Sequence, residues 1–411
     1  SVTQAQRKGF LALTCVLMLG LLGYFKYAVF LLENLQALTT FPSVIPDIIL
    51  PIGISFYTFQ LLSSVVDVYR GEVQAQRRYW LLLLYASLFH QCIAGPIVRY
   101  QDVEHDILHR KVSLYDTSRG ITRFSVGLAK KALLANSCAA LADTLLPLDA
   151  DKLASVSGFA VLLGGLCYML QIYLDFSAYS DMAIGMGLMV GFHYLENFNY
   201  PYISDSVTDF WRRWHISLGS FFRDYVYIPL GGNRCTVGRQ ILNLCAVWFL
   251  TGLWHGASWN YVLWGLYFLL FLLIEKFVFK LSRECTGGAA MLRRGYTLLV
   301  VYFGWFLFRF EDLGMLGTAM GNLFGGSPAG FFDTASVMSL KNNCFFLILA
   351  CLACLPIAPR LGQVLTDMGR RSILSARING IISIVIPPLL VFVSLLALVG
   401  NSYNPFLYFQ F

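Results

Sequence analysis

The amino-acid sequence predicts an all-α, polytopic integral membrane protein. Hydrophobic residues make up 57% of the 411 residues, against about 45–50% in globular proteins, and charged residues make up only 13%, against about 25%. The mean hydropathy is +0.64. So few charges cannot cover the surface of a soluble protein of this length. The composition therefore excludes both a disordered chain and a soluble enzyme.

Apolar stretches follow one another along the chain, and a membrane span needs about 20 apolar residues. The first apolar stretch, residues 10–32, is too long for the hydrophobic part of a signal peptide and has no obvious cleavage site, so we interpret it as a membrane helix. The chain begins at Ser1 rather than Met, and we expect that an N-terminal piece is missing. We expect about nine to eleven crossings, with candidate spans at 10–32, 44–66, 79–98, 120–146, 155–174, 240–254, 259–279, 296–310, 342–357 and 381–398.

The pattern changes between residues 175 and 230. The pattern over residues 175–191 predicts a short helix that carries several polar residues. Asp175 and Asp181 are six positions apart and point to different faces of this helix, so we expect no catalytic carboxylate pair. Residues 204–227 carry charges among aromatics and cannot face lipid, so this segment must be re-entrant, interfacial or buried in the bundle. There is no short-period repeat and no matching pair of broken helices, so we expect one domain over residues 1–411.

The formal net charge of +7 is distributed in short basic runs between apolar stretches. Runs such as 70–78 and 293–294 are typical of the cytoplasmic ends of membrane helices. A nucleic-acid partner would require a clustered basic face, and none is expected. His105 and His109 have helical i, i+4 spacing, but we interpret them as part of a solvated interfacial helix and expect no metal site. The ten cysteines are interpreted mainly as small buried side chains.

His255 lies between two long apolar stretches, in FLTGLWHGASWNYVLWG. A histidine at membrane depth needs a polar partner or a wet cavity, so function is the first hypothesis for it. Gly252 and Gly256 leave room for a substrate or a neighbouring backbone. Imidazole is also the commonest general base near neutral pH. The alternative, a core histidine bonded to a carbonyl, stays open on these grounds.

His215 lies in a segment rich in aromatic and charged residues, DFWRRWHISLGSFFRDYVYIPLGGNR. Trp211 and His215 have i, i+4 spacing and are predicted to share a helix face, while Asp209 and Arg213 can form an ion pair. On such a helix the side chains of Arg212 and Arg213 point about 100° apart. The segment fits a helix that lines a wet cavity and equally a helix that lies in the headgroup region.

Several long motifs resemble those of the membrane-bound O-acyltransferases, and most closely the branch of the alginate O-acetyltransferase membrane subunits. The resemblance extends over nearly the whole chain, although family members usually carry further membrane segments before the first helix seen here. The motifs that carry it are PIGISFYTFQ (51–60), VDVYRG (66–71), IAGPIVRY (93–100), DFSAYSDMAIGMGLMVGF (175–192), ENFNYPYISDSVTDFWRRWHISLGSFFRDYVYIPLGGNR (196–234), LWHGASWNYVLWG (253–265) and YNPFLYFQF (403–411).

The resemblance implies a multi-pass enzyme of the bacterial inner membrane, with short or re-entrant helices around a central tunnel and a catalytic core within 175–265. It implies transfer of an acyl group, acetyl first among them, from a cytoplasmic thioester such as acetyl-CoA to an acceptor for extracytoplasmic polysaccharide O-acetylation, with alginate, cellulose or peptidoglycan as acceptor. An esterase-like acetyltransferase partner and the polysaccharide synthesis machinery are implied with it. The alternatives are D-alanyl transfer to teichoic acid and a non-catalytic transporter or scaffold for polysaccharide export.

Within that resemblance, His255 matches the catalytic histidine of the family and His215 its second characteristic histidine. We expect His255 to act as general base, and His215 to orient the donor, polarise its carbonyl or bind the oxyanion. Arg212 and Arg213, with Arg223, either attract the phosphates of acyl-CoA or pair with nearby carboxylates. No bound cofactor is expected. The further candidates for substrate binding are Trp211, Trp254, Asn260 and Asp181.

Overall fold

The computed structural model describes residues 3–39, 45–92, 95–280, 286–400 and 406–407. These residues form helices and loops without a β-strand, which confirms the all-α prediction. The first half of the chain forms α1 (Gln4–Leu38), α2 (Ile54–Arg70), α3 (Tyr79–Ala86), α4 (Tyr100–His109), α5 (Leu114–Ala129), η1 (Lys130–Ala135), α6 (Asn136–Leu145), α7 (Ala150–Ala154) and α8 (Gly158–Met189). The second half forms η2 (Pro201–Ile203), α9 (Val207–Arg213), α10 (Ile216–Phe222), η3 (Arg223–Tyr227), α11 (Val237–His255), α12 (Trp259–Leu273), η4 (Ile274–Phe279), α13 (Gly287–Arg309), α14 (Leu313–Gly321), η5 (Asn322–Gly326), α15 (Thr334–Ala353), α16 (Ile357–Arg371) and α17 (Ile373–Val399).

Five of the described helical segments are long and apolar enough to cross a membrane, and the chain is a multi-pass membrane protein. They are Gln4–Leu38, Gly158–Met189, Trp259–Phe279, Thr334–Ala353 and Ile373–Val399. The other expected spans, at 44–66, 79–98, 120–146, 240–254 and 296–310, are not among these five segments. The stretch 79–98, for example, is helical only over α3 among its described residues, 79–92 and 95–98, and the eight residues of α3 extend roughly 12 Å at the helical rise of about 1.5 Å per residue. The chain then turns at His90, at the helix break that the following Gly–Pro pair indicates.

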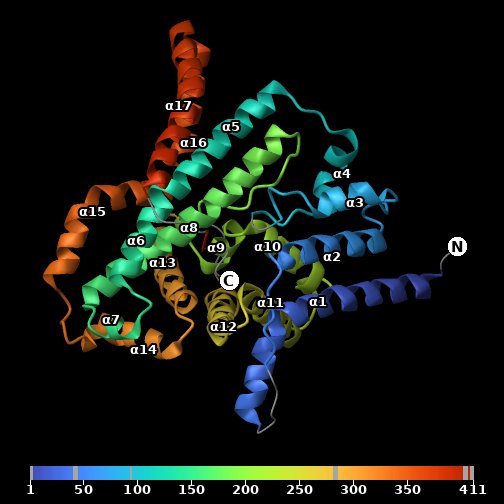
Figure 1. Ribbon diagram of the computed structural model, residues 1–411, viewed down its shortest axis with the longest axis horizontal. Helices are drawn as coiled ribbons and strands as arrows, with labels where there is room; N and C mark the ends of the chain where they lie inside the picture. The colour runs from blue at the N-terminus through green and yellow to red at the C-terminus, as the bar shows by residue number, and fades with distance from the viewer. Residues whose placement is uncertain (1–2, 40–44, 93–94, 281–285, 401–405, 408–411) are drawn as a thin grey trace.

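Helix α8 is the central element of the bundle, and Figure 1 shows α5 and α6 running beside it. The prediction of a separate short helix over 175–191 is wrong, because α8 continues without a break for 32 residues. Its polar residues have partners on the neighbouring helical run: Lys131 binds Asp175 at 2.5 Å and Lys130 binds Asp181 at 2.6 Å. Because these carboxylates are paired, the helix can stay buried across them.

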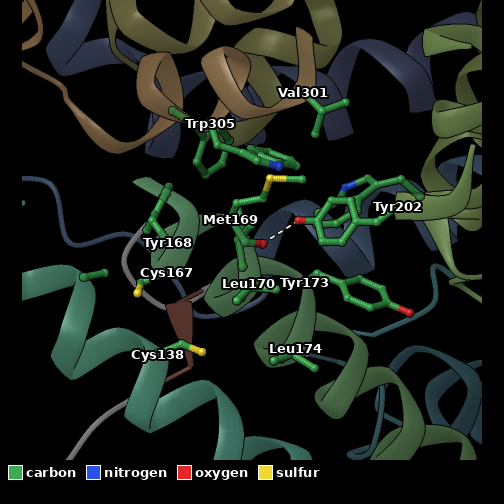
Figure 2. Close-up of a cluster of buried hydrophobic side chains, with 14 of the residues drawn as sticks. Cys138, Cys167, Tyr168, Met169, Leu170, Tyr173, Leu174, Tyr202, Val301 and Trp305 are labelled. Atoms are coloured by element: carbon green, nitrogen blue, oxygen red, sulfur yellow. Dashed lines mark hydrogen bonds between the residues drawn. The ribbon is translucent and has the colours of Figure 1, made fainter. Parts of the chain in front are cut away.

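Aromatic and aliphatic side chains fill the space between α8, α9, α12 and α13. Figure 2 shows part of this core, in which the Tyr202 hydroxyl donates a hydrogen bond to the carbonyl of Met169 while Tyr173 and Trp305 pack nearby. Residues 201–214 insert into this core through η2 and α9, with Phe210 fully buried. The buried residues of α10 pack in a second cluster with α2, and η3 has no buried residue, so only the first part of the segment 204–227 is buried in this core of the bundle.

Helices α11 and α12 form a hairpin with unusually close backbones. A Cβ atom added at Gly252 would lie 2.4 Å from the Tyr261 carbonyl oxygen, and one added at Gly265 would lie 2.4 Å from that of Trp248. At the turn, a Cβ at Gly256 would lie 2.3 Å from the Tyr261 ring. Glycine at Gly252 and Gly265 lets the neighbouring backbone approach, as the sequence predicted for Gly252, whereas at Gly256 it is an aromatic side chain that approaches.

The motif 403–411 lies largely outside the described residues, and only Phe406 and Leu407 are described. The backbone N–H of Leu407 donates to the Asp175 carboxylate at 2.7 Å. The ammonium of Lys131 lies 4.5 Å from the centroid of the Phe406 ring. This part of the C-terminal segment therefore packs against the middle of α8.

The close hairpin predicts that Gly252→Ala destabilises the protein, because the new methyl group meets a backbone oxygen that cannot rotate away. Overpacking of this kind costs about 1–3 kcal/mol. The measurement is the midpoint of thermal unfolding of purified protein in detergent. Gly317→Ala is the matched control, since Gly317 is helical with nothing within 4 Å of its added Cβ. Equal midpoints for the two variants would contradict the packing argument.

Candidate active site

His255 is the last residue of α11 and stands at the turn of the α11–α12 hairpin. Only 9% of the residue is exposed. Its ring contacts those of Trp254, Trp264 and Phe308, with centroids 4.9, 4.8 and 5.1 Å away and planes nearly perpendicular. Edge-to-face packing against these three rings fixes the orientation of the imidazole. Its two nitrogens make no hydrogen bond among the described residues.

A small cavity of about 30 Å³ adjoins His255, and we call it the histidine cavity. It has room for a group about the size of a water molecule. The imidazole therefore borders a space that side chains do not fill. Its walls are Ile172, Asp175, Phe176, Trp214, His255, Trp305, Phe308 and Leu407.

His215 lies between α9 and α10 in a left-handed conformation, with φ 44° and ψ 57°. The prediction that Trp211 and His215 share a helix face is wrong, because α9 already ends at Arg213. The left-handed region is uncommon for a residue with a side chain, and it persists only where surrounding contacts enforce it. Here it turns the His215 ring inward, where only 2% of the residue is exposed.

Asn197 holds His215 in this conformation. Its Oδ1 lies 3.1 Å from His215 Nδ1 and also accepts from Ser217, from the N–H at 3.2 Å and the hydroxyl at 2.9 Å. The backbone N–H can only donate, so it fixes which amide atom is the oxygen. His215 Nδ1 must then carry the proton, and Nε2 presents a lone pair. Nε2 is buried and has no hydrogen-bond partner among the described residues.

Trp254 lies against both histidines. Its ring centroid is 5.6 Å from that of His215 and 4.9 Å from that of His255. The carbonyl oxygen of Trp254 accepts a hydrogen bond from the ammonium of Lys26 in α1. The predicted candidate Trp254 is thus a shared wall between the two imidazoles.

Two adjoining cavities lie on the His215 side. The larger, of about 760 Å³, is polar, and we call it the basic basin. The smaller, of about 350 Å³, leads to His215 and is called the apolar channel. Both include Thr208, Arg212, Tyr227, Leu244 and Leu272 in their walls, so they are contiguous. The charged residues of the basic basin are Asp205, Asp209, Arg212, Arg213, Glu275, Lys276, Lys280, Arg293 and Arg294.

The carboxylates of the basic basin already have partners. Asp209 binds Arg213 at 2.8 Å, which confirms the predicted i, i+4 pair, and Asp205 lies 3.6 Å from Arg293. Glu275 accepts from the N–H groups of Val207 and Thr208 at the start of α9. Six cations against three anions leave the cavity with a surplus of positive charge.

The three arginines of the predicted phosphate site have different environments. Arg212 lines both the basin and the channel and has no ion pair among the described residues, whereas Arg213 is paired. Arg223 binds Asp224 at 2.6 Å, and Arg99 binds the same carboxylate at 2.8 Å. Burial by itself raises the pKa of Asp224, but these two guanidinium groups outweigh it and hold the pKa below its ordinary value. Arg223 is therefore committed to Asp224.

The remaining predicted residues lie in different surroundings. Trp211 lines the apolar channel, packs 4.8 Å from Phe268, and has a buried Nε1 without a partner among the described residues. Asn260 is fully buried and donates to the Leu307 carbonyl at 3.3 Å, which ties α12 to α13. Asp181 is paired with Arg123 at 2.9 Å and with Lys130. Neither Asn260 nor Asp181 lines a cavity described above.

A further cavity of about 680 Å³, which we call the far basin, lies beyond the histidine cavity and shares Leu407 with it. Arg309 and Gln171 are among its walls, and Gln171 Oε1 is buried without a partner among the described residues. Arg294 and Arg309 lie roughly 22 Å apart along α13, at the helical rise of about 1.5 Å per residue. The two basins therefore lie near opposite ends of this helix, with the histidines between them.

Sequence reasoning missed Asn197, Lys276, Arg294 and Gln171. Asn197 lies inside a motif already singled out, but nothing local indicates that it holds His215. Arg294 was interpreted only as a marker of membrane orientation. Lys26 was also missed, although a lone lysine within the apolar stretch 10–32 is a signal that could have drawn attention to it.

The sequence profile of the membrane-bound O-acyltransferase family matches residues 78–317 of this chain. A probable alginate O-acetylase, AlgI, from Azotobacter vinelandii is 38% identical, over 100% of this chain and 86% of that protein. A peptidoglycan O-acetyltransferase from Helicobacter pylori is 35% identical, over 64% of this chain and 54% of that protein. A teichoic acid D-alanyltransferase from Bacillus subtilis is 27% identical, over 62% of this chain and 68% of that protein.

The contacts of His215 predict its tautomer. In protein labelled with ¹⁵N-histidine, Nδ1 of His215 should give a pyrrole-type resonance and Nε2 a pyridine-type one, because Asn197 Oδ1 accepts a hydrogen bond from the N–H at Nδ1. Asn197→Leu should abolish this preference, and His215→Gln identifies the resonances. A pyridine-type Nδ1 in the unsubstituted protein would contradict the assignment.

Proposed function

This chain belongs to the membrane-bound O-acyltransferase family, and we propose that it transfers acetyl groups from a thioester to a hydroxyl acceptor for polysaccharide O-acetylation outside the cytoplasm. The alginate O-acetylase similarity over the whole chain supports this acceptor class. D-alanyl transfer to teichoic acid is the second candidate, with lower identity and coverage behind it. We place the protein in the bacterial inner membrane, with an esterase-like acetyltransferase and the polysaccharide synthesis machinery as partners.

The observation that carries the proposal is the series of cavities with shared walls. The basic basin adjoins the apolar channel, the channel shares Trp214 with the histidine cavity, and that cavity shares Leu407 with the far basin. His215 lines the channel and His255 the histidine cavity. A donor and an acceptor arriving from opposite ends of α13 would meet between the two imidazoles.

The donor is assigned to the basic side. A surplus of cations suits the phosphates of acetyl-CoA, and arginine pairs well with phosphate. The apolar channel suits the less charged pantetheine arm, which would carry the thioester toward His215. Because Nδ1 of His215 donates to Asn197, the free Nε2 carries a lone pair and can only accept a hydrogen bond. Orienting an N–H group of the acyl donor therefore fits His215 better than binding an oxyanion.

His255 acts as general base in this proposal. The imidazole takes the proton of the acceptor hydroxyl while that oxygen attacks the thioester carbonyl carbon. The carbon–sulfur bond then breaks, and the proton passes from the imidazole to the leaving sulfur, which departs as a thiol. The new ester leaves toward the far basin, where Gln171 Oε1 can accept from a hydroxyl-rich acceptor, while Arg309 is held by Asp143 and the Leu146 carbonyl.

His255→Ala should lower acetyl transfer by about 10²–10⁴-fold, the usual contribution of a general base, while the protein still expresses. The measurement follows label from acetyl-CoA into covalent product with purified membranes. His105→Ala is the matched control, since the His105 side chain is 83% exposed. Ordinary turnover by folded His255→Ala protein would refute the assignment. Uptake of label without covalent product would instead favour a transporter.

Arg212→Gln should raise KM for acetyl-CoA by roughly 10-fold or more and change kcat little, because a charge-assisted contact to phosphate is worth about 1.5–3 kcal/mol. Arg213→Gln is the matched control and should have a smaller effect, since Arg213 is already paired with Asp209. Acetyl-pantetheine lacks the phosphates and should show no difference between Arg212→Gln and the unsubstituted protein. An equal loss with both donors would contradict the phosphate assignment.

A further inference from the structure

Helix α1 lies before the region that the family profile matches and presents mostly exposed, apolar side chains. Lys26 is the single charged residue between Lys8 and Glu33. Its side chain points into the protein, where its ammonium lies 5.9 Å from the centroid of the Trp254 ring. A charged side chain within a membrane helix costs free energy, so the group that the ammonium of Lys26 contacts indicates the role of this residue.

One face of α1 contacts the turn between α11 and α12 at several points. Lys26 donates to the Trp254 carbonyl, and the Tyr27 hydroxyl donates to the Leu253 carbonyl at 2.7 Å. One turn further along α1, the Phe30 ring lies 5.7 Å from that of Trp259, and Trp259 Nε1 donates to Asn34 Oδ1 at 2.8 Å. Helix α1 therefore holds both ends of the turn that carries His255.

The carbonyl groups at the C-terminal end of α11 need hydrogen-bond donors from outside the helix. The last four carbonyls of a helix have no partner within it, and a cation is favoured there by the helix dipole. Among the described residues, the N–H of Gly256 does not return a hydrogen bond to the helix. Lys26 and Tyr27 supply donors to two of these carbonyls instead.

The Lys26 contact acts directly on the peptide that bears His255. The Trp254 carbonyl belongs to the peptide bond between Trp254 and His255, and that bond is planar. Fixing the carbonyl oxygen therefore fixes the orientation of the His255 backbone N–H and, with the three aromatic rings, the direction of the imidazole. A displacement of about 1 Å at a reacting group can cost about 10²-fold in rate.

We propose that Lys26 is a positioning residue for acyl transfer: its ammonium, bound to the Trp254 carbonyl, holds the C-terminal end of α11 so that His255 faces the histidine cavity. This role rests on the proposed function of His255 as general base. It gives α1 a part in the reaction although α1 lies outside the matched region. The role belongs to the cation, with Tyr27 as a weaker second support.

The test uses the full chain, with Lys26→Met to remove the cation at similar length and Lys8→Met as the matched control from the exposed start of the same helix. Lys26→Met should lower kcat by about 10- to 100-fold. KM for acetyl-CoA should stay within about twofold, because donor binding is untouched. Lys26→Arg, which keeps the charge, should recover most of kcat, and Tyr27→Phe should lose less than Lys26→Met.

A second readout follows the imidazole itself. Diethyl pyrocarbonate modifies exposed imidazoles, and mass spectrometry can compare His255 with His105 in the same molecule. His255 should react faster in Lys26→Met, because its backbone is no longer held. A wild-type kcat in Lys26→Met, or a lowered kcat with an unchanged rate of His255 modification, overturns the proposal. If Lys26→Met does not fold, Lys26→Gln is judged by the same two measurements.

The two proposals fail separately. If His255→Ala is inactive while Lys26→Met turns over normally, only the role of Lys26 is lost. If His255→Ala turns over normally, the general-base assignment is lost first, whatever Lys26 does.

Discussion

The contact between the backbones of α11 and α12 determines the geometry of the site. Gly252 and Gly265 bring a helix carbonyl of the partner to within 2.4 Å of where a side chain would begin. The hairpin closes this tightly because glycine stands at these positions, and His255 stands at its turn. The aromatic rings around the imidazole and the contacts from α1 all depend on where that turn lies. Because the imidazole is already held in one orientation, little further orientational entropy is lost when the transition state forms.

Several carboxylates inside the bundle have cationic or backbone partners. Asp175 and Asp181 are paired with lysines, Asp224 with two arginines, and Glu275 with the start of α9. A buried polar atom without a partner costs free energy, and several such atoms occur among the described residues. His215 Nε2, Trp211 Nε1 and Gln171 Oε1 are those whose residues line the apolar channel or the far basin, where a substrate could reach them.

The sequence correctly predicted a contact between near neighbours on one helix, but it did not predict where helices end and where they continue. Asp209 and Arg213 pair as their spacing indicates, because i, i+4 neighbours meet on any helix. The same reasoning failed for Trp211 and His215, since the helix ends between them and a left-handed residue redirects the chain. The polar residues of 175–191 suggested a break in α8, but lysines from the neighbouring helical run neutralise them and the helix continues.

The membrane environment, the all-α class and the two histidines worth examining follow from the amino-acid sequence alone, because composition and a polar residue in an apolar stretch are local properties. Which groups act together follows from how the helices pack. Lys26 and the Trp254 carbonyl are 228 positions apart, and Asn197 reaches His215 from another segment. Spacing along a chain carries no information about such contacts. They arise from how helices pack, and packing decides which charges pair and which polar atoms remain free to bind a substrate.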